Sequence, residues 1–194
     1  MSKIKICGLR RKIDIEYVND LMPDYIGFIL SPGFRRSISF ETAARLREQL
    51  SDKITAVGVF VNADKEFINA FVDKGIIDMV QLHGSESPAF CERINAPVIK
   101  YFRCGRNTAE EIKKYDTPYY LFDSGTGSGT EFDWNDIPKT ETPFFLAGGI
   151  SEQNIDRAIR TIKPFAVDIS SSVETDGFKD YNKIKRIMEM ARYE

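Results

Sequence analysis

Short β-strand patterns alternate with amphipathic helical patterns along the whole chain, and this alternation predicts an α/β fold, a single (β/α)8 TIM barrel. Successive strands begin roughly 20 to 30 residues apart, about the length of one strand plus one crossover helix. With 194 residues the chain suits one domain, spanning residues 1–194, without a linker or low-complexity segment. An open doubly wound sheet is the alternative. It normally carries G-x-G-x-x-G after its first strand, where this chain has CGLRRK.

The strands are predicted from β-branched and aromatic runs, several of them apolar throughout, as is typical of strands buried on both faces. In chain order they span residues 3–7, 24–30, 54–60, 78–83, 97–102, 118–123, 143–148 and 165–170. The first strand is an alternating run in which Ile4 and Ile6 precede Cys7 and a glycine.

Helical patterns fill the connections between the strands. Residues 39–50 form an apolar face and offer Ser39 or Thr42 as the N-cap, and residues 63–75 show the same periodicity and end at Gly75. Similar patterns occupy residues 87–94, 107–115, 151–162 and 180–193, whereas the stretch DWNDIP after the sixth strand is too short for a full helix.

The composition argues against several classes of function. Lys and Arg number 27 and Asp and Glu 29, so the net charge of −2 gives no electrostatic footprint for nucleic acid. No apolar run approaches the roughly 20 residues of a membrane span, and the N-terminus lacks the apolar centre of a signal peptide. Three cysteines without C-x-x-C spacing fit a reducing, cytoplasmic location. The single histidine, His83, argues against a multi-histidine metal site and leaves carboxylates or a thiol as proton carriers.

In a barrel of this kind the functional site is built at the carboxyl ends of the strands. The residues there are Cys7, the SPGFRR loop, Asn62, His83, Arg103, Asp123, Gly148, Gly149, Ser170 and Ser171. Cys7 stands where a strand stops, a position typical neither of a packing cysteine nor of a disulfide. This favours a functional thiol, and an inert buried thiol is the alternative. Asp123 closes an apolar strand, where a carboxylate is costly unless it is paired, solvated or used. A cap for the following turn is the alternative there.

Two motifs at the last strands predict a phosphate site. LAGGIS supplies the glycines Gly148 and Gly149, which let backbone amides approach an anion closely. VDISSS supplies serine hydroxyls and amides at the start of a short extra helix. A plain turn with a helix cap is the alternative for either motif alone. Together, after strands seven and eight, they match the recurrent phosphate site of this barrel class.

The other candidates carry weaker signals. Arg35 and Arg36 follow the second strand and suit a bidentate carboxylate contact, although a solvated charge pair is the simpler interpretation. His83 is expected to form a hydrogen bond at the mouth of the barrel. Cys91 lies in an apolar helical pattern and is expected in the core, and Cys104 is a loop residue without an assigned role. The glycine-rich stretch SGTGSGTEFDW predicts a mobile cover over the site.

Taken together, the motifs resemble one family along the whole chain and in the same order. KICGL, GFILSPGFRRSIS, VQLHG, LFD with GTEFDW, LAGGIS and VDISSSVE are similar to the corresponding motifs of the phosphoribosylanthranilate isomerases of tryptophan biosynthesis. The resemblance implies an Amadori rearrangement of N-(5'-phosphoribosyl)anthranilate to 1-(2-carboxyphenylamino)-1-deoxyribulose 5-phosphate, with no cofactor and no metal. It also implies a small phosphorylated substrate and a monomer or homodimer.

The resemblance also implies roles for individual residues. Cys7 matches the general base and Asp123 the general acid of the family. Arg36 matches the arginine that holds the anthranilate carboxylate, and Asp168 an aspartate that approaches the ribose. The residues that match the phosphate site are Gly148, Gly149, Ser170 and Ser171.

The chain departs from the family pattern in two places. Ser172 stands where the family usually has glycine, and the loop after strand six carries Ser128, Thr130 and Glu131 at divergent positions. Two other functions are alternatives. The related isomerase of histidine biosynthesis would have an aspartate in place of Cys7. A non-catalytic barrel that only binds phosphorylated ligands, or serves as a partner subunit, would not need both Cys7 and Asp123.

Overall fold

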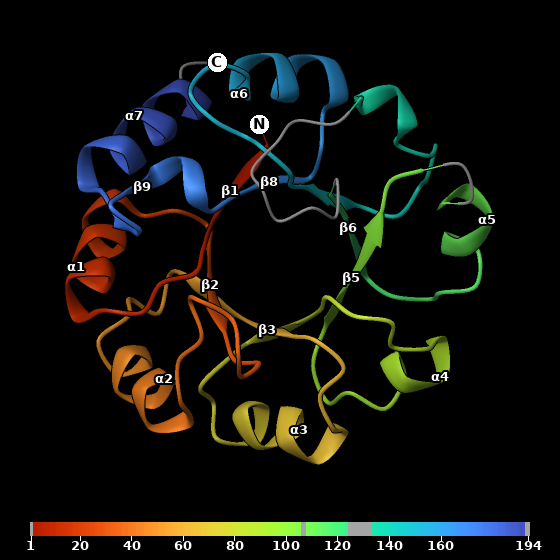
Figure 1. The fold of residues 1–194 in the computed structure, drawn as a ribbon, viewed down its shortest axis with the longest axis horizontal. Helices are drawn as coiled ribbons and strands as arrows, with labels where there is room; N and C mark the ends of the chain where they lie inside the picture. Colours follow the sequence, from red (N-terminus) through yellow and green to blue (C-terminus); the bar gives the residue numbers. More distant parts are fainter. Residues whose placement is uncertain (1, 106–107, 124–132, 193–194) are drawn as a thin grey trace.

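A computed structural model of the chain describes residues 2–105, 108–123 and 133–192. Its strands are β1 (Lys3–Cys7), β2 (Tyr25–Ile29), β3 (Thr55–Phe60), β4 (Met79–Leu82), β5 (Val98–Arg103), β6 (Tyr119–Asp123), β7 (Phe144–Leu146) and β8 (Ala166–Ile169). Each strand pairs in parallel with the next, and β8 pairs with β1, so the sheet closes into a barrel (Figure 1). The predicted barrel fold is confirmed, and each strand lies within one or two residues of its predicted range.

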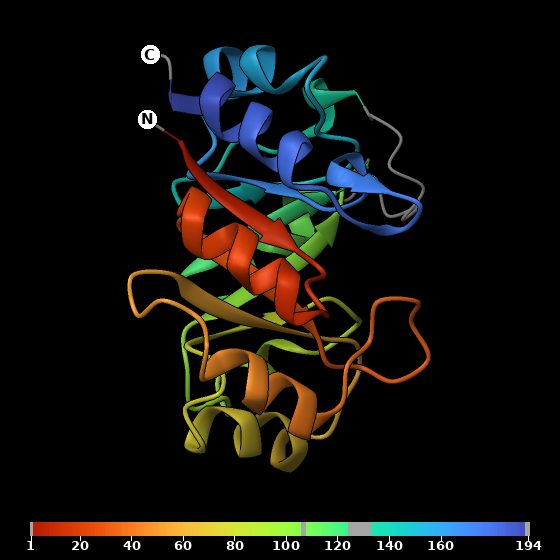
Figure 2. The ribbon, with the colours of Figure 1, turned by 90° about the vertical axis from the view of Figure 1, so that its left-hand side faces the viewer.

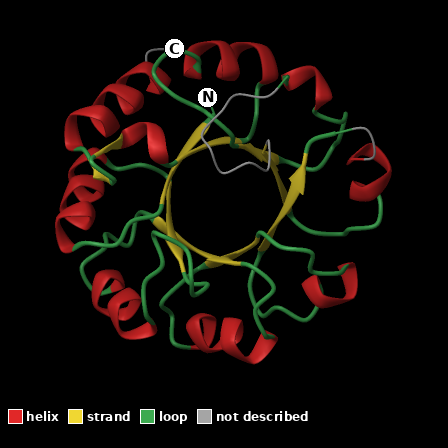
Figure 3. Cartoon of the chain, in the orientation of Figure 1, coloured by secondary structure: helices red, strands yellow, loops and turns green. Residues whose placement is uncertain are grey.

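Helices surround the ring of strands (Figure 3). They are α1 (Lys12–Leu21), α2 (Phe40–Arg47), α3 (Lys65–Asp73), α4 (Pro88–Cys91), α5 (Thr108–Ile112), α6 (Ile155–Arg157), which continues as a π-helical turn η2 (Ala158–Ile162), and α7 (Tyr181–Arg192). Short 3-10 helices are η1 (Trp134–Asp136) and η3 (Ser171–Val173), and β9 (Glu174–Thr175) pairs with β10 (Phe178–Lys179). Ser39 accepts a hydrogen bond from the Thr42 amide at 3.3 Å and caps α2 as predicted.

Helix α1 was not among the predicted helices. A carboxylate lies on its buried face, because Asp14 is 1% exposed, and this charge interrupts the apolar pattern. Arg11 holds Asp14 at 2.7 Å, and the Asp14 carboxylate accepts hydrogen bonds from the backbone amides of Arg10 and Arg11. Figure 2 shows α1 beside α7, where the rings of Tyr17 and Tyr181 meet at 5.4 Å.

Alternation along the strands separates two apolar regions. On β1, Ile4 and Ile6 face outward into the core between strands and helices. On the other strands the alternate residues fill the barrel interior, and this inner cluster comprises Tyr25, Val57, Met79, Ile99, Leu121, Phe145, Ala147 and Ala166. Because side chains alternate with period two, Lys5 and Cys7 point into the barrel.

A buried ion pair fixes the carboxyl ends of three neighbouring strands. Glu86 and Lys100 are 2.8 Å apart and each side chain is 2% exposed. Glu86 also accepts hydrogen bonds from the backbone amides of Asn62 and Gly84, and Lys100 donates to the carbonyl of Gly84. These contacts fix the loop that follows His83, and they lie between the strands and the helices, outside the barrel interior.

None of the helices in the described part of the chain combines the length and the apolar character that crossing a membrane requires.

Candidate active site

The carboxyl ends of the strands enclose a cavity of about 460 Å³. The residues that line it include all those for which the family resemblance implies a role: Cys7, Arg36, Asp123, Gly148, Gly149, Asp168, Ser170 and Ser171. Asn62 and Arg103, which also stand at strand ends, are not among its lining residues in the described part of the chain. The structure therefore brings together, from five parts of the chain, the groups that the motifs singled out.

Cys7 lies at the end of β1 and is 7% exposed. It packs against β2, because a Cβ atom at Gly27 would lie 2.6 Å from the Cys7 sulfur. Glycine at this position therefore makes room for the thiol. Burial raises the pKa of Cys7, although the charges of Lys5 and Lys179 oppose it. The net pKa lies above that of a free cysteine, because burial outweighs both ammonium groups.

Asp168 forms an ion pair inside the barrel with Lys5. The Lys5 Nζ to Asp168 Oδ2 distance is 2.9 Å, and the side chains are 0% and 8% exposed. The second carboxylate oxygen, Oδ1, is buried and has no hydrogen-bond partner among the described residues. Since Asp168 also lines the cavity, its carboxylate is placed to accept a hydrogen bond from a ligand hydroxyl.

His83 follows β4 and lines the same cavity. Its ring stacks on Tyr101 with centroids 4.0 Å apart, and its Nδ1 lies 3.0 Å from Gln81 Nε2. The hydrogen bond predicted for His83 at the mouth is thus present. Burial lowers the pKa of His83 although Asp123 and Asp168 act to raise it, so the imidazole is neutral near pH 7. Gln81 was not predicted as a site residue; its place two residues before His83 on a strand was the available signal.

Arg36 reaches the cavity while held by Glu174, the first residue of β9. Arg36 Nε lies 2.6 Å from Glu174 Oε1, and Arg36 Nη2 lies 3.0 Å from Oε2. Arg35 and Lys179 contact the same carboxylate at 2.7 and 3.0 Å. Burial acts to raise the pKa of Glu174, but hydrogen bonds from Arg36 and the Lys179 charge lower it to about 2.

The two arginines differ in their surroundings. The Arg36 side chain is 18% exposed and lines the cavity, whereas that of Arg35 is 56% exposed and does not. Within the described part of the chain, Arg36 Nη1 makes no hydrogen bond and remains available to an anionic ligand. Glu174 and Lys179 were missed by the motif analysis. Glu174 stands at the end of VDISSSVE, but nothing local shows that it folds back onto Arg36.

The loops after β7 and β8 meet at one side of the cavity. Gly148 and Gly149 have φ angles of 81° and 75°, a left-handed conformation that side chains disfavour. Asn154 Nδ2 donates to the Gly149 carbonyl at 2.9 Å, and Ser172 Oγ donates to the Ile150 carbonyl at 2.6 Å. The predicted short helix is η3, which begins at Ser171. The backbone amides and hydroxyls here are placed to surround an anion.

Asp123 is the last residue of β6 and lies opposite Arg103 of β5 in the strand register. It lines the cavity from a strand that does not neighbour β1, so Cys7 and Asp123 approach from different sides. The expected mobile cover begins directly after Asp123. Most of it, including Ser128, Thr130 and Glu131, lies outside the described residues.

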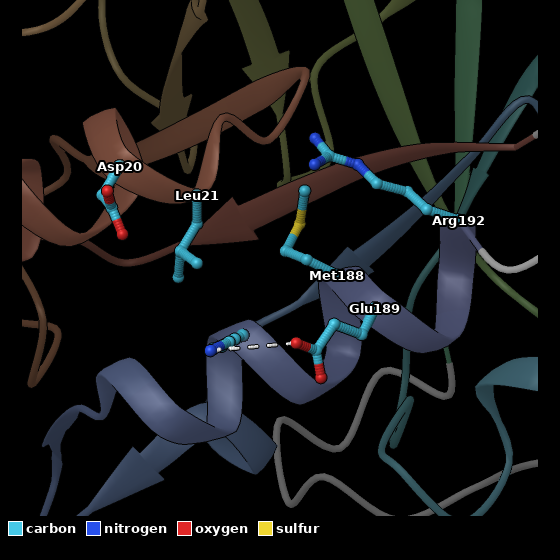
Figure 4. A pocket seen from close by; sticks show the side chains of 6 residues that line it. Asp20, Leu21, Met188, Glu189 and Arg192 are labelled. Atoms are coloured by element: carbon cyan, nitrogen blue, oxygen red, sulfur yellow. Dashed lines mark ion pairs between the residues drawn. The ribbon is translucent and has the colours of Figure 1, made fainter.

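A second cavity, of about 390 Å³, lies on the outside of the barrel between α1 and α7 (Figure 4). Asp20, Leu21 and Arg192 line it, together with the ion pair Lys185–Glu189 at 3.9 Å. Helix α1 returns the chain to the start of β2, so its carboxyl end, with Asp20 and Leu21, lies at the amino ends of the strands. This cavity is therefore at the opposite end of the barrel from Cys7.

Comparison with known proteins connects this geometry to a family. A family model described as N-(5'phosphoribosyl)anthranilate (PRA) isomerase matches residues 4–190. The chain belongs to the phosphoribosylanthranilate isomerase family. The N-(5'-phosphoribosyl)anthranilate isomerase of Endomicrobium trichonymphae is 43% identical over 201 residues, which cover 99% of each chain.

Solved structures of this family show the same fold. Monomers generated from the dimeric phosphoribosylanthranilate isomerase of Thermotoga maritima match with a TM-score of 0.87 at 32% identity, covering 99% of each chain. A phosphoribosylanthranilate isomerase in complex with reduced 1-(o-carboxyphenylamino)-1-deoxyribulose 5-phosphate matches with a TM-score of 0.84 at 30% identity, again over 99% of each chain. The resemblance inferred from the motifs is thereby confirmed.

Ser172, which replaces the usual phosphoribosylanthranilate isomerase glycine, fits without backbone strain. It lies in the right-handed turn of η3, and its hydroxyl joins the loops after β7 and β8 through Ile150. We expect Ser172→Gly to lower the free energy of unfolding by about 1–2 kcal/mol, from the lost hydrogen bond and the added backbone freedom. Denaturant unfolding measures this change. Ser172→Ala isolates the hydrogen bond; a variant as stable as the original protein would show that the bond contributes nothing.

Proposed function

We propose that Cys7 is the general base and Asp123 the general acid of this phosphoribosylanthranilate isomerase. The chain catalyses the Amadori rearrangement of N-(5'-phosphoribosyl)anthranilate to 1-(2-carboxyphenylamino)-1-deoxyribulose 5-phosphate in tryptophan biosynthesis. The observation that carries the assignment of roles is the convergence of a buried thiol and a carboxylate on one cavity from non-adjacent strands. An acid and a base on different sides of a sugar are what the reaction needs.

The reaction then proceeds in two proton transfers. Asp123 protonates the ribose ring oxygen, and the ring opens to a Schiff base. The Cys7 thiolate removes the proton from C2', and the resulting enolamine rearranges to the ketone. Each transfer by a positioned side chain typically accelerates a reaction by ~10²- to 10⁴-fold.

Three groups of contacts hold the substrate in the proposed complex. The phosphate lies between Gly148, Gly149, Ser170 and Ser171, at the loops that follow β7 and β8. Asp168 accepts a hydrogen bond from the ribose through Oδ1, the oxygen that lacks a partner among the described residues. Arg36 binds the anthranilate carboxylate. The mechanism that we propose is carried out by these side chains alone, with neither a cofactor nor a metal.

The proposal extends to the state of the chain in the cell. We infer one catalytic barrel domain over residues 1–194, which acts as a monomer or homodimer on a small phosphorylated substrate. We also infer a cytoplasmic protein without nucleic-acid or membrane partners. The free thiols of Cys7, Cys91 and Cys104 support a reducing compartment.

The direct test supplies phosphoribosylanthranilate and follows the loss of anthranilate-type fluorescence, with and without a metal chelator. We expect turnover that the chelator does not change. Tight ligand binding without turnover would favour a barrel that only binds phosphorylated ligands. If the protein converts the aminoaldose of histidine biosynthesis but not phosphoribosylanthranilate, the related isomerase is favoured.

Arg36→Met is expected to weaken substrate binding by roughly ten- to a hundredfold, because losing a charged hydrogen-bond partner costs ~1.5–3 kcal/mol. Arg35→Met is the matched control, since each change leaves Glu174 two of its three cationic partners. Binding of an unreactive product analogue, measured by calorimetry, separates affinity from turnover. Equal losses in the two variants, or a larger loss at Arg35, would contradict the choice of Arg36.

A further inference from the structure

Lys5 is a buried cation inside the barrel that no step of the proposed reaction uses. It precedes Cys7 by two residues on β1, so both side chains point into the interior. In the strand register Lys5 lies opposite Asp168, and its ammonium is 2.9 Å from the Asp168 carboxylate. A buried charge is costly unless it is paired. The pairing of β1 with β8 therefore holds a cation one layer below the thiol.

Several elements present charged or titratable groups around Cys7: Lys5 from β1, Arg36 after β2, His83 after β4, Asp123 from β6, Asp168 from β8 and Lys179 from β10. On strand β2, Gly27 lies against the thiol. The charges of Arg36 and Lys179 are both directed onto Glu174, which binds them at 2.6 and 3.0 Å. Lys5 differs from these two cations, because it lies on the same strand face as the thiol.

The charges act on Cys7 in opposite directions. Burial raises the pKa of Cys7, and the Lys5 charge is the strongest influence that lowers it. Asp168 acts in the same direction as burial. Burial would also lower the pKa of Lys5, but the Asp168 charge and the Cys7 side chain raise it above its usual value. Because its pKa lies above the usual value, Lys5 is an ammonium near neutral pH.

We propose that Lys5 is a positioning residue for the isomerase, whose Asp168-held ammonium stabilises the anionic Cys7 sulfur. The inference rests on the proposed role of Cys7 as base. No bond to Lys5 forms or breaks: the proton from C2' of the substrate passes to sulfur, and Lys5 remains an ammonium throughout. Asp168 thus has two functions, since one oxygen holds Lys5 and the residue also lines the cavity.

Alkylation of Cys7 by iodoacetamide tests the proposal in the free enzyme, because only the thiolate reacts. Mass spectrometry of the Cys7 peptide separates this thiol from Cys91 and Cys104. We expect Lys5→Met to slow Cys7 alkylation below the thiol pKa by about tenfold or more, since a nearby opposite charge shifts a pKa by ~1–3 units. Lys5→Arg keeps the charge and should restore most of the rate.

Asp168→Asn should change the alkylation rate of Cys7 in the opposite direction to Lys5→Met. Removing the carboxylate takes away a negative charge near the sulfur, so alkylation should become faster, by about tenfold for each unit of pKa change. If Lys5→Met does not fold, because it leaves Asp168 unpaired, Lys5→Met/Asp168→Asn is compared with Asp168→Asn alone. These two variants differ only in the Lys5 charge, and the double variant should react about tenfold or more slowly.

Each outcome decides the proposal. Slower alkylation together with a turnover profile moved to higher pH would support it, because a residue that only stabilises the fold would not move a titration. An unchanged alkylation profile on removing Lys5 would overturn it. Slower alkylation with unchanged turnover would overturn the catalytic role of Lys5. The assignment of Cys7 as base is tested separately, by the turnover of Cys7→Ala with Lys5 intact.

Discussion

Cys7→Ala is expected to lower turnover by about 10²- to 10⁴-fold while the substrate still binds, because removing a general base typically costs this much. The layout of the cavity explains why turnover should fall while binding is kept. Cys7 closes β1 at one side, whereas the phosphate loops and Arg36 enclose the rest of the space. Single-turnover rates and the affinity for a product analogue, measured separately, give the two quantities.

Cys104 provides the matched control for this change. It is a free thiol outside the cavity, and burial raises its pKa to about 12. Cys104→Ala should therefore retain the turnover of the original protein. Cys7→Ser should be impaired nearly as much as Cys7→Ala, because a hydroxyl is a far weaker proton acceptor than a thiolate. Turnover of Cys7→Ala close to that of the original protein would disprove the assignment of the base.

Asp123→Asn is expected to abolish ring opening, because the amide keeps the shape of the carboxyl group but cannot deliver the same proton. The loss should be at least ~10²-fold in turnover, the lower limit typical of a missing general acid. Contacts to the phosphate and the anthranilate should remain, so the affinity for a product analogue should change little. Stopped-flow measurement of the anthranilate fluorescence follows the step directly.

Asp116→Asn is the control for this variant, since Asp116 is exposed and precedes the same strand at its other end. It should leave turnover unchanged. If Asp123→Asn retained more than about a tenth of the original turnover, against the ~10²-fold minimum for a lost acid, Asp123 would not be the acid. Asp168 would then be the next candidate, because it is the other carboxylate that lines the cavity in the described residues.

The pH dependence of turnover at low pH follows from Cys7. Protonation of Cys7 removes the base, so turnover falls as the pH is lowered. Burial raises the pKa of Cys7, so this fall in turnover should occur at a higher pH than the pKa of a free cysteine would give. The pH profile of turnover measures this fall.

Much of the barrel could be predicted because its signals are local. Runs such as DYIGFIL and ITAVGVF specify strands by their own composition, and the regular spacing of eight of them favours closure. Helix α1 escaped prediction because Asp14 is charged and yet buried. Its burial is compensated by Arg11 and by backbone amides of the preceding loop, contacts that no hydrophobic periodicity reveals.

The sequence by itself determined the order of strands, the family, and which residues stand at the strand ends, since each of these depends on neighbouring residues or on motifs in a fixed order. Only the tertiary structure decided how the charges are paired. Lys5 meets Asp168, and Glu174 meets Arg36, across 163 and 138 residues of chain. Such pairs arise from strand register and from a loop folding back, and the free energy of a buried charge depends on the partner that it finds there. For that reason the protonation of Cys7 depends on the closed barrel and not on the motif KICGL alone.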